Sequence, residues 1–115
     1  MFKPAGKKRQ QWCGISIYRY KELQAFCLQY AEKQKRITAG AKKREAQRLQ
    51  RDLDLIEETA KEAGGEVYSW LLVNVTTGTK YADLSRDLGA VPLPKREFDE
   101  RRQLFFLKMD NRRAI

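Results

Sequence analysis

The chain is 115 residues long and carries a formal net charge of +9, with no histidine. One compact core fits this length, whereas two independent cores would each be too small to persist. The absence of histidine excludes His-based catalytic triads, His-dependent zinc sites and a histidine general base. With hydrophobic residues at 42% and charged residues at 34%, the composition predicts a folded, basic and mainly helical protein.

The cysteines and the apolar segments bear on the cellular compartment. Cys13 and Cys27 lack the spacing and partners of a metal site. Cys27 falls in an apolar helical stripe, which predicts a buried thiol, and we expect no disulfide between the two. The basic N-terminal segment, MFKPAGKKRQ, precedes no apolar stretch of a signal peptide, and apolar runs such as 70–73 are too short to cross a membrane. We therefore expect a cytoplasmic protein without a membrane partner.

The charge and hydropathy pattern of the N-terminal third predicts an arm followed by a helix. Residues 1–17 form a flexible basic arm in this interpretation, in which Lys7, Lys8 and Arg9 are candidate contacts to nucleic acid; a frayed, solvated terminus is the alternative. A helix is predicted over 18–36. Its apolar side chains, which recur at the helical period, are Leu23, Phe26, Cys27 and Tyr30.

The clearest helix is predicted over 41–63. Its apolar side chains are spaced alternately three and four residues apart, as in the seam of a coiled coil. They are Ala46, Leu49, Leu53, Ile56, Ala60 and Ala63. Because half of this seam is alanine, we expect the helix to pack against the preceding one as an antiparallel hairpin over 18–65. Self-association through the seam, giving a homodimer, is the alternative.

The C-terminal part, 66–115, predicts three helices over 66–77, 81–88 and 94–113. Two helices joined by a tight turn, the second opening on basic residues, are typical of a helix-turn-helix, whose second helix enters the DNA major groove. The sequence thus predicts an all-α protein in a single compact domain, with an N-terminal helical hairpin and a C-terminal tri-helical helix-turn-helix unit.

The proposed turn and core of this unit depend on a few residues. Gly89 allows a sharp turn, and Pro94 suits the first turn of the last helix, where its missing N–H is not needed. We expect Leu84 and Leu88 to pack against the last helix. Their predicted partners there are Phe98 and Phe105.

The outer face of the last helix carries the candidate DNA contacts. Opposite Phe98 lie Arg96, Glu100, Gln103 and Leu107. Arg96 and Gln103 are the predicted base readers, since Arg bonds guanine and Gln bonds adenine through paired hydrogen bonds. The side chains predicted to reach phosphates or extend the basic surface are Lys95, Arg101, Arg102, Lys108, Arg112 and Arg113. The positive charge adds sequence-independent affinity, so double-stranded DNA is the predicted partner, with RNA as an alternative.

Other readings of these residues stay open. Asp99 and Glu100 make the last helix mixed in sign, so its charges are also consistent with a solvated face. Tyr18 and Tyr20 are expected in the core rather than stacked on bases.

We predict no enzyme, no catalytic residue, no metal site and no cofactor, because the paired carboxylates lie on a charged helix face and no serine has a histidine partner.

From Val67 onward the chain resembles RinA/ArpU-type late-transcription regulators of phages and prophages of Gram-positive bacteria. The residues that carry the resemblance are Trp70 to Gly78, Tyr81 to Leu84, Val91-Pro92, Arg96, Phe98, Arg101-Arg102 and Phe105-Phe106. The C-terminal part of those regulators resembles sigma factor region 4. The resemblance implies promoter binding in the cytoplasm of a bacterial host, with host RNA polymerase as a second partner. It places Arg96, Arg101 and Arg102 on the recognition helix.

An alternative from another class is a small phage protein that binds and inhibits a host protein or nucleoprotein machine. A CRISPR nuclease or RNA polymerase is the kind of target such a protein blocks. The mixed signs on the last helix suit a protein surface as well as they suit DNA.

Overall fold

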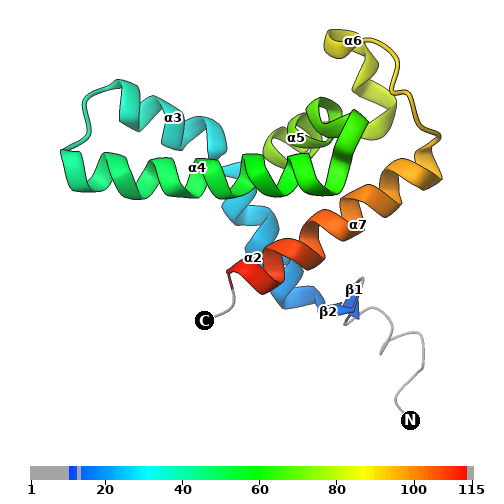
Figure 1. Ribbon diagram of the computed structural model, residues 1–115, viewed down its shortest axis with the longest axis horizontal. Helices are drawn as coiled ribbons and strands as arrows, with labels where there is room; N and C mark the ends of the chain where they lie inside the picture. Colours follow the sequence, from blue (N-terminus) through cyan, green and yellow to red (C-terminus); the bar gives the residue numbers. More distant parts are fainter. Residues whose placement is uncertain (1–10, 13, 114–115) are drawn as a thin grey trace.

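The computed structural model describes residues 11–12 and 14–113 and confirms an all-α fold (Figure 1). Its α-helices are α2 (Ile17–Leu28), α3 (Tyr30–Thr38), α4 (Lys43–Gly64), α5 (Tyr68–Thr77), α6 (Ser85–Leu88) and α7 (Lys95–Arg112). Two 3₁₀ helices, η1 (Gly65–Val67) and η2 (Tyr81–Asp83), precede α5 and α6. Strands β1 (Gln11–Trp12) and β2 (Ile15–Ser16) form one short antiparallel ladder.

The long helix α4 is the centre of the fold, and its predicted seam is confirmed. Leu49, Leu53 and Ile56 are buried, as are the two alanines that follow them in the seam, whereas Ala46 is half-buried. The N-terminal half of α4 packs against α3, and the rest of α4 meets α5 and α7 (Figure 1). Gly65, with φ of 55°, ends α4 and turns the chain into η1 and α5 almost at once.

The predicted continuous helix over 18–36 is wrong, because the chain breaks at Gln29 between α2 and α3. Only α3 runs along α4, so the hairpin is formed by 30–64 and not by 18–65. Helix α2 turns away and packs against α5 and α7, where its apolar residues Leu23, Phe26 and Cys27 are buried. The break is needed because α2 and α3 bury their apolar faces against different helices.

The prediction of a flexible arm over 1–17 is wrong for the described residues of this range, which are 11–12 and 14–17. Residues 11–12 and 15–16 pair in the β ladder, and the Ser16 hydroxyl accepts a hydrogen bond of 3.0 Å from the Arg19 backbone N–H, which caps α2. The candidate contacts Lys7, Lys8 and Arg9 lie outside the described residues, as does Cys13.

The predicted helix over 81–88 is also different in the structure. It is divided into η2 and the four-residue α6, so it does not supply a full first helix of a helix-turn-helix. Leu84 is buried, but Leu88 is 38% exposed, so the predicted packing of Leu88 on the last helix is wrong. Pro94 is the residue before α7 rather than its first helical residue.

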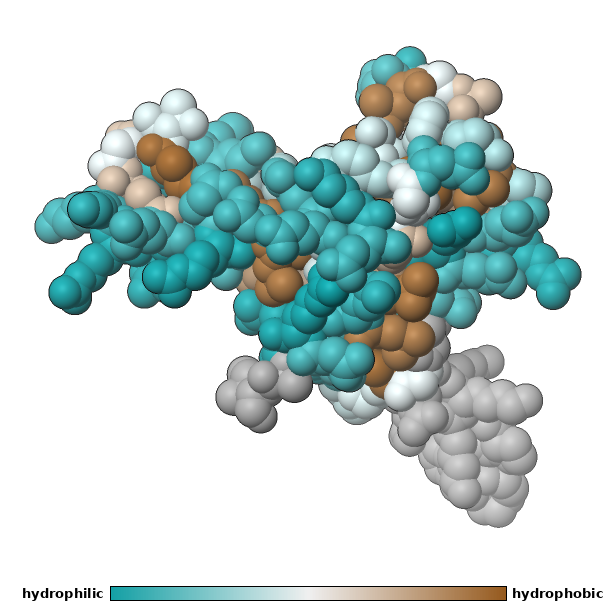
Figure 2. All heavy atoms as spheres, in the orientation of Figure 1, coloured by the Kyte–Doolittle hydropathy of each residue, from teal (hydrophilic) through white to brown (hydrophobic). Residues whose placement is uncertain are grey.

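One hydrophobic core joins the hairpin to the C-terminal helices. Its main members are Leu23 and Cys27 of α2, Ile56, Ala60 and Ala63 of α4, Leu71 and Val75 of α5, Leu84, and Phe98, Phe105, Phe106 and Met109 of α7. The molecule is elongated, 53 × 36 × 20 Å. Hydrophilic side chains extend from both ends of the long axis, at the α3–α4 turn and at the start of α7 (Figure 2). Across the described part of the chain, no helix combines the length and apolarity that membrane crossing requires.

Candidate nucleic-acid interface

Helix α7 has one face fixed in the core and one face in solvent. Phe98, Phe105, Phe106 and Met109 are each at most 1% exposed and pack among α4, α2 and α5. The opposite row is exposed, as the helical period predicts, and consists of Arg96, Glu100, Gln103 and Leu107. The aromatic anchors therefore hold α7 in place while its outer row lies at the surface of the molecule.

The first three turns of α7 form a shallow hollow of about 440 Å³. It is lined by Lys95, Arg96, Asp99, Glu100 and Gln103. The Lys95 ammonium lies 2.8 Å from the Asp99 carboxylate, so the charge of Lys95 is compensated locally. Arg96 forms no ion pair with any residue that the structure describes, which leaves its guanidinium available at the rim of the hollow. The two predicted base readers are therefore brought together at one surface.

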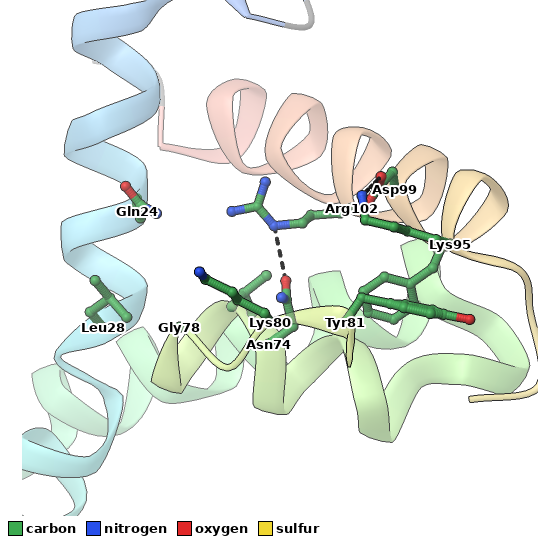
Figure 3. A pocket seen from close by; sticks show the side chains of 11 residues that line it. Gln24, Leu28, Asn74, Gly78, Lys80, Tyr81, Lys95, Asp99 and Arg102 are labelled. Atoms are coloured by element: carbon green, nitrogen blue, oxygen red, sulfur yellow. Dashed lines mark hydrogen bonds and ion pairs between the residues drawn. The ribbon is translucent and has the colours of Figure 1, made fainter. Parts of the chain in front are cut away.

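Arg102 has a different position from the one its sequence pattern suggests. Its Nε donates to the Asn74 side-chain oxygen at 2.9 Å (Figure 3). Its Nη2 donates to the Tyr20 hydroxyl at 2.7 Å. The guanidinium also lies 5.0 Å from the centre of the Phe106 ring. Arg102 thus connects α7 to α5 and α2, and these donors are engaged within the molecule.

A second hollow, of about 330 Å³, lies between α2, α5, η2 and the first half of α7 (Figure 3). Lys80, Lys95 and Arg102 line it together with the side chains of Asn74 and Tyr81. Asn74 is not among the residues that the sequence predicts for a site. The sequence does contain a sign of its role, because Asn74 is a polar residue within the apolar run of α5. A partly buried amide needs a hydrogen-bond partner, so its position predicts a polar contact inside the fold.

The basic residues at the C-terminal end of α7 are occupied by other parts of the fold. Arg112 donates to the Thr59 hydroxyl at 2.8 Å and also bonds the Glu62 carboxylate, and Lys108 lies 3.7 Å from the same carboxylate. The hydrogen bond from Arg112 lowers the pKa of Glu62, which keeps this acid ionised and its partners engaged. The Arg113 guanidinium lies 3.7 Å from the centre of the Phe26 ring.

The remaining predicted residues, Arg101, Tyr18 and Tyr20, differ in how far they are buried. Arg101 is half-buried, with its guanidinium close to Gly65 at the end of α4. Tyr18, expected in the core, is 72% exposed, so that prediction is wrong. Tyr20 does pack on the core, with its ring edge-on to Phe106 at 5.1 Å between ring centres.

Two side chains that sequence reasoning treated only as apolar residues hold the connection before α7. The Trp70 indole N–H donates to the Gly89 carbonyl at 2.9 Å, and the Tyr81 hydroxyl donates to the Leu93 carbonyl at 2.6 Å. The Tyr81 ring also packs against Phe98, with 5.4 Å between ring centres. These contacts fix the start of α7, which carries the exposed row.

Two hydroxyl or thiol groups of the described chain, those of Cys27 and Tyr30, have raised pKa values. Burial raises the pKa of the Cys27 thiol to about 12, so it is protonated at neutral pH. Burial, followed by the hydrogen bond to Glu57, raises the pKa of the Tyr30 hydroxyl. Within 11–12 and 14–113, no group of three or more Cys, Asp or Glu residues is arranged to bind a metal ion.

Comparisons with protein-family models, with curated proteins and with solved structures gave no match to this chain.

Proposed function

We propose that this protein binds double-stranded DNA through the first half of α7 and regulates transcription. The observation that carries the proposal is the exposed row Arg96, Glu100 and Gln103 on a helix whose opposite face is fixed in the core. An α-helix fits the B-DNA major groove, and a rigid helix presents its side chains to base edges in one register.

The chemistry of the row suits base recognition. Arg96 would donate both of its terminal N–H groups to guanine O6 and N7, and Gln103 would pair with adenine N6 and N7. Glu100 between them would accept from a cytosine amino group. Gln103 lies seven positions after Arg96, which is about 10 Å along a helix and about three base-pair steps. Lys95 lies beside this row, and Lys80 lines the neighbouring hollow with Lys95. Lys80 would contact phosphates, and Lys95 would do so by exchanging its ion pair with Asp99 for a phosphate.

The resemblance of the C-terminal half to RinA/ArpU-type regulators supports the same proposal. It suggests a phage or prophage regulator that acts at promoters in the bacterial cytoplasm, with host RNA polymerase as a second partner. A helix-turn-helix in this chain would have an abbreviated first helix, α6, and the hydrogen bonds of Trp70 and Tyr81 would stabilise the connection to the recognition helix.

Selection of duplexes from a random library, followed by sequencing, tests the proposal. The wild-type chain should enrich a defined motif. Arg96→Ala should lose the preference at one base pair and weaken binding to the enriched motif by about 1–3 kcal/mol. Arg86→Ala is the matched control, because Arg86 is an exposed arginine on α6, outside the row. Failure of the wild-type chain to enrich any motif would refute the proposal.

A protein-binding adaptor or inhibitor is the second candidate. Leu104 and Leu107 on α7 are 40% and 37% exposed, and Glu97 and Glu100 share the outer side of the helix. Exposed leucines beside mixed charges fit a protein surface better than they fit phosphates. Retention of a host protein by the wild-type chain, and its loss with Leu104→Ala and Leu107→Ala, would favour this candidate if no DNA motif is enriched.

A further inference from the structure

The turn between α3 and α4 carries a basic cluster that the sequence analysis did not assign. We define the hairpin tip as the exposed side chains Lys35, Lys42, Lys43, Arg44, Arg48 and Arg51. Between positions 35 and 51 the only acidic residue is Glu45, and its carboxylate pairs with Arg36. None of the tip side chains forms an ion pair with another residue described in the structure.

The placement of these charges is not explained by helix stability. Lys43 and Arg44 occupy the first turn of α4, at the positive end of its dipole, where basic residues are unfavourable. Acidic residues gather instead in the second half of the same helix, where Glu57, Glu58 and Glu62 lie toward its negative end. Glu45 in the first turn and Lys61 in the last turn are favourably placed, but the excess of basic residues at the start of α4 opposes the helix dipole. A ligand with negative charge would compensate the repulsion at the tip.

The shape of the tip suits an extended polyanion rather than a small anion. Arg44, Arg48 and Arg51 follow each other at helical spacing along one side of α4, and Lys42 and Lys43 continue the basic surface into the turn. The exposed amide of Gln47 lies among them and adds a hydrogen-bond donor, whereas the Gln50 amide donates to the Asp54 carboxylate at 2.9 Å. A row of cations about as long as two helical turns matches successive phosphates of a duplex backbone.

We propose that the hairpin tip binds the phosphate backbone of double-stranded DNA, as a second contact surface distinct from α7. The tip and the start of α7 lie at opposite ends of the long axis, in a molecule 53 Å long (Figures 1 and 2). The tip supplies affinity without base recognition, because its side chains are flexible cations. Its contribution is therefore independent of the sequence preference assigned to Arg96.

The test measures binding to a fluorescent duplex of random sequence over a series of salt concentrations. The tip variant is Lys42→Gln with Lys43→Gln, and the matched control is Lys21→Gln with Lys61→Gln, two exposed lysines outside the tip. Both variants lose the same charge. The tip variant should bind about tenfold more weakly at low salt, and its log–log salt slope should fall by about 1–2. The control should lose less than about threefold, and Lys42→Arg with Lys43→Arg should behave as wild type.

Equal losses in the tip variant and the control would overturn the proposal, since net charge alone would then account for the binding. An unchanged affinity of the tip variant would overturn it too. Vesicles containing phosphatidylserine provide a second probe: loss of vesicle binding by the tip variant, with full DNA affinity retained, would assign the tip to a membrane surface instead. The selection experiment with Arg96→Ala measures sequence preference, whereas the salt titration with the tip variant measures the salt slope on random DNA. The proposal for α7 and the proposal for the hairpin tip can therefore fail independently.

Discussion

Single polar side chains determine how the helices of this protein meet. Arg102 shows this most clearly, because its guanidinium bonds the Asn74 amide and the Tyr20 hydroxyl from two other helices. Lys33 of α3 is buried and pairs with Asp52 of α4 at 2.9 Å, while its ammonium also lies over the Phe26 ring. Such bonds compensate the loss of water around a buried charge, so these cations serve packing instead of a ligand.

The reactivity of Cys27 provides a prediction at this scale. Because burial raises its pKa to about 12, Cys27 is almost entirely in the weakly reactive thiol form at pH 8. In a Cys13→Ser background, we expect Cys27 to resist a thiol reagent in the folded chain and to react promptly in denaturant. Peptide mass spectrometry over time measures the difference. Labelling of the folded chain at the denatured rate would contradict the burial of this thiol.

Among the elements, the junction between α2 and the end of α7 depends on Arg19. Its Nε donates to the Asp110 carboxylate at 2.7 Å, and its Nη2 donates to the Arg113 carbonyl at 2.9 Å. The second bond satisfies a carbonyl at the end of α7, where no helical partner remains. Arg19 therefore both links the two helices and caps one of them.

Substitution of Arg19 should loosen this junction. Arg19→Met keeps much of the apolar stem and removes the charge-assisted bonds, so we expect the free energy of unfolding to fall by about 1–3 kcal/mol. Lys21→Met, two residues along α2 and exposed, should change it by less than about 0.5 kcal/mol. Urea unfolding of the three chains gives the comparison, and equal midpoints for all three would disprove the capping role.

At the scale of the whole molecule, one core spans both halves of the chain. Ile56 of α4 is fully buried in the same cluster as Leu71 of α5 and Phe105 of α7. A hairpin and a C-terminal unit that share a core are expected to unfold together.

Removal of Ile56 side-chain volume tests this coupling. Ile56→Ala should lower the free energy of unfolding by about 2–5 kcal/mol, and the far-UV circular dichroism and tryptophan fluorescence transitions should stay coincident. Leu104→Ala, at a position 40% exposed, is the control and should have a much smaller effect. Two separate transitions would show that the halves are independent units.

The sequence alone determined the features that depend on local periodicity. The seam from Leu49 to Ala63 predicts a helix with one buried face, and the spacing around Phe98 predicts which side of the last helix is buried and which side carries Arg96 and Gln103. These predictions succeed because a helix fixes the direction of each side chain relative to its neighbours.

Only the tertiary structure decided which helices meet and which cations are occupied. The break at Gln29 leaves no mark in the helical period, because it depends on α2 and α3 packing against different partners. The sequence around Arg102 and Arg112 gives no sign that they are hydrogen-bonded within the fold. Their partners, Asn74 and Thr59, lie 28 and 53 positions away along the chain. Contacts at such separations are set by the packing of the whole chain, so the available cations at Arg96 and at the hairpin tip emerge only from the folded molecule.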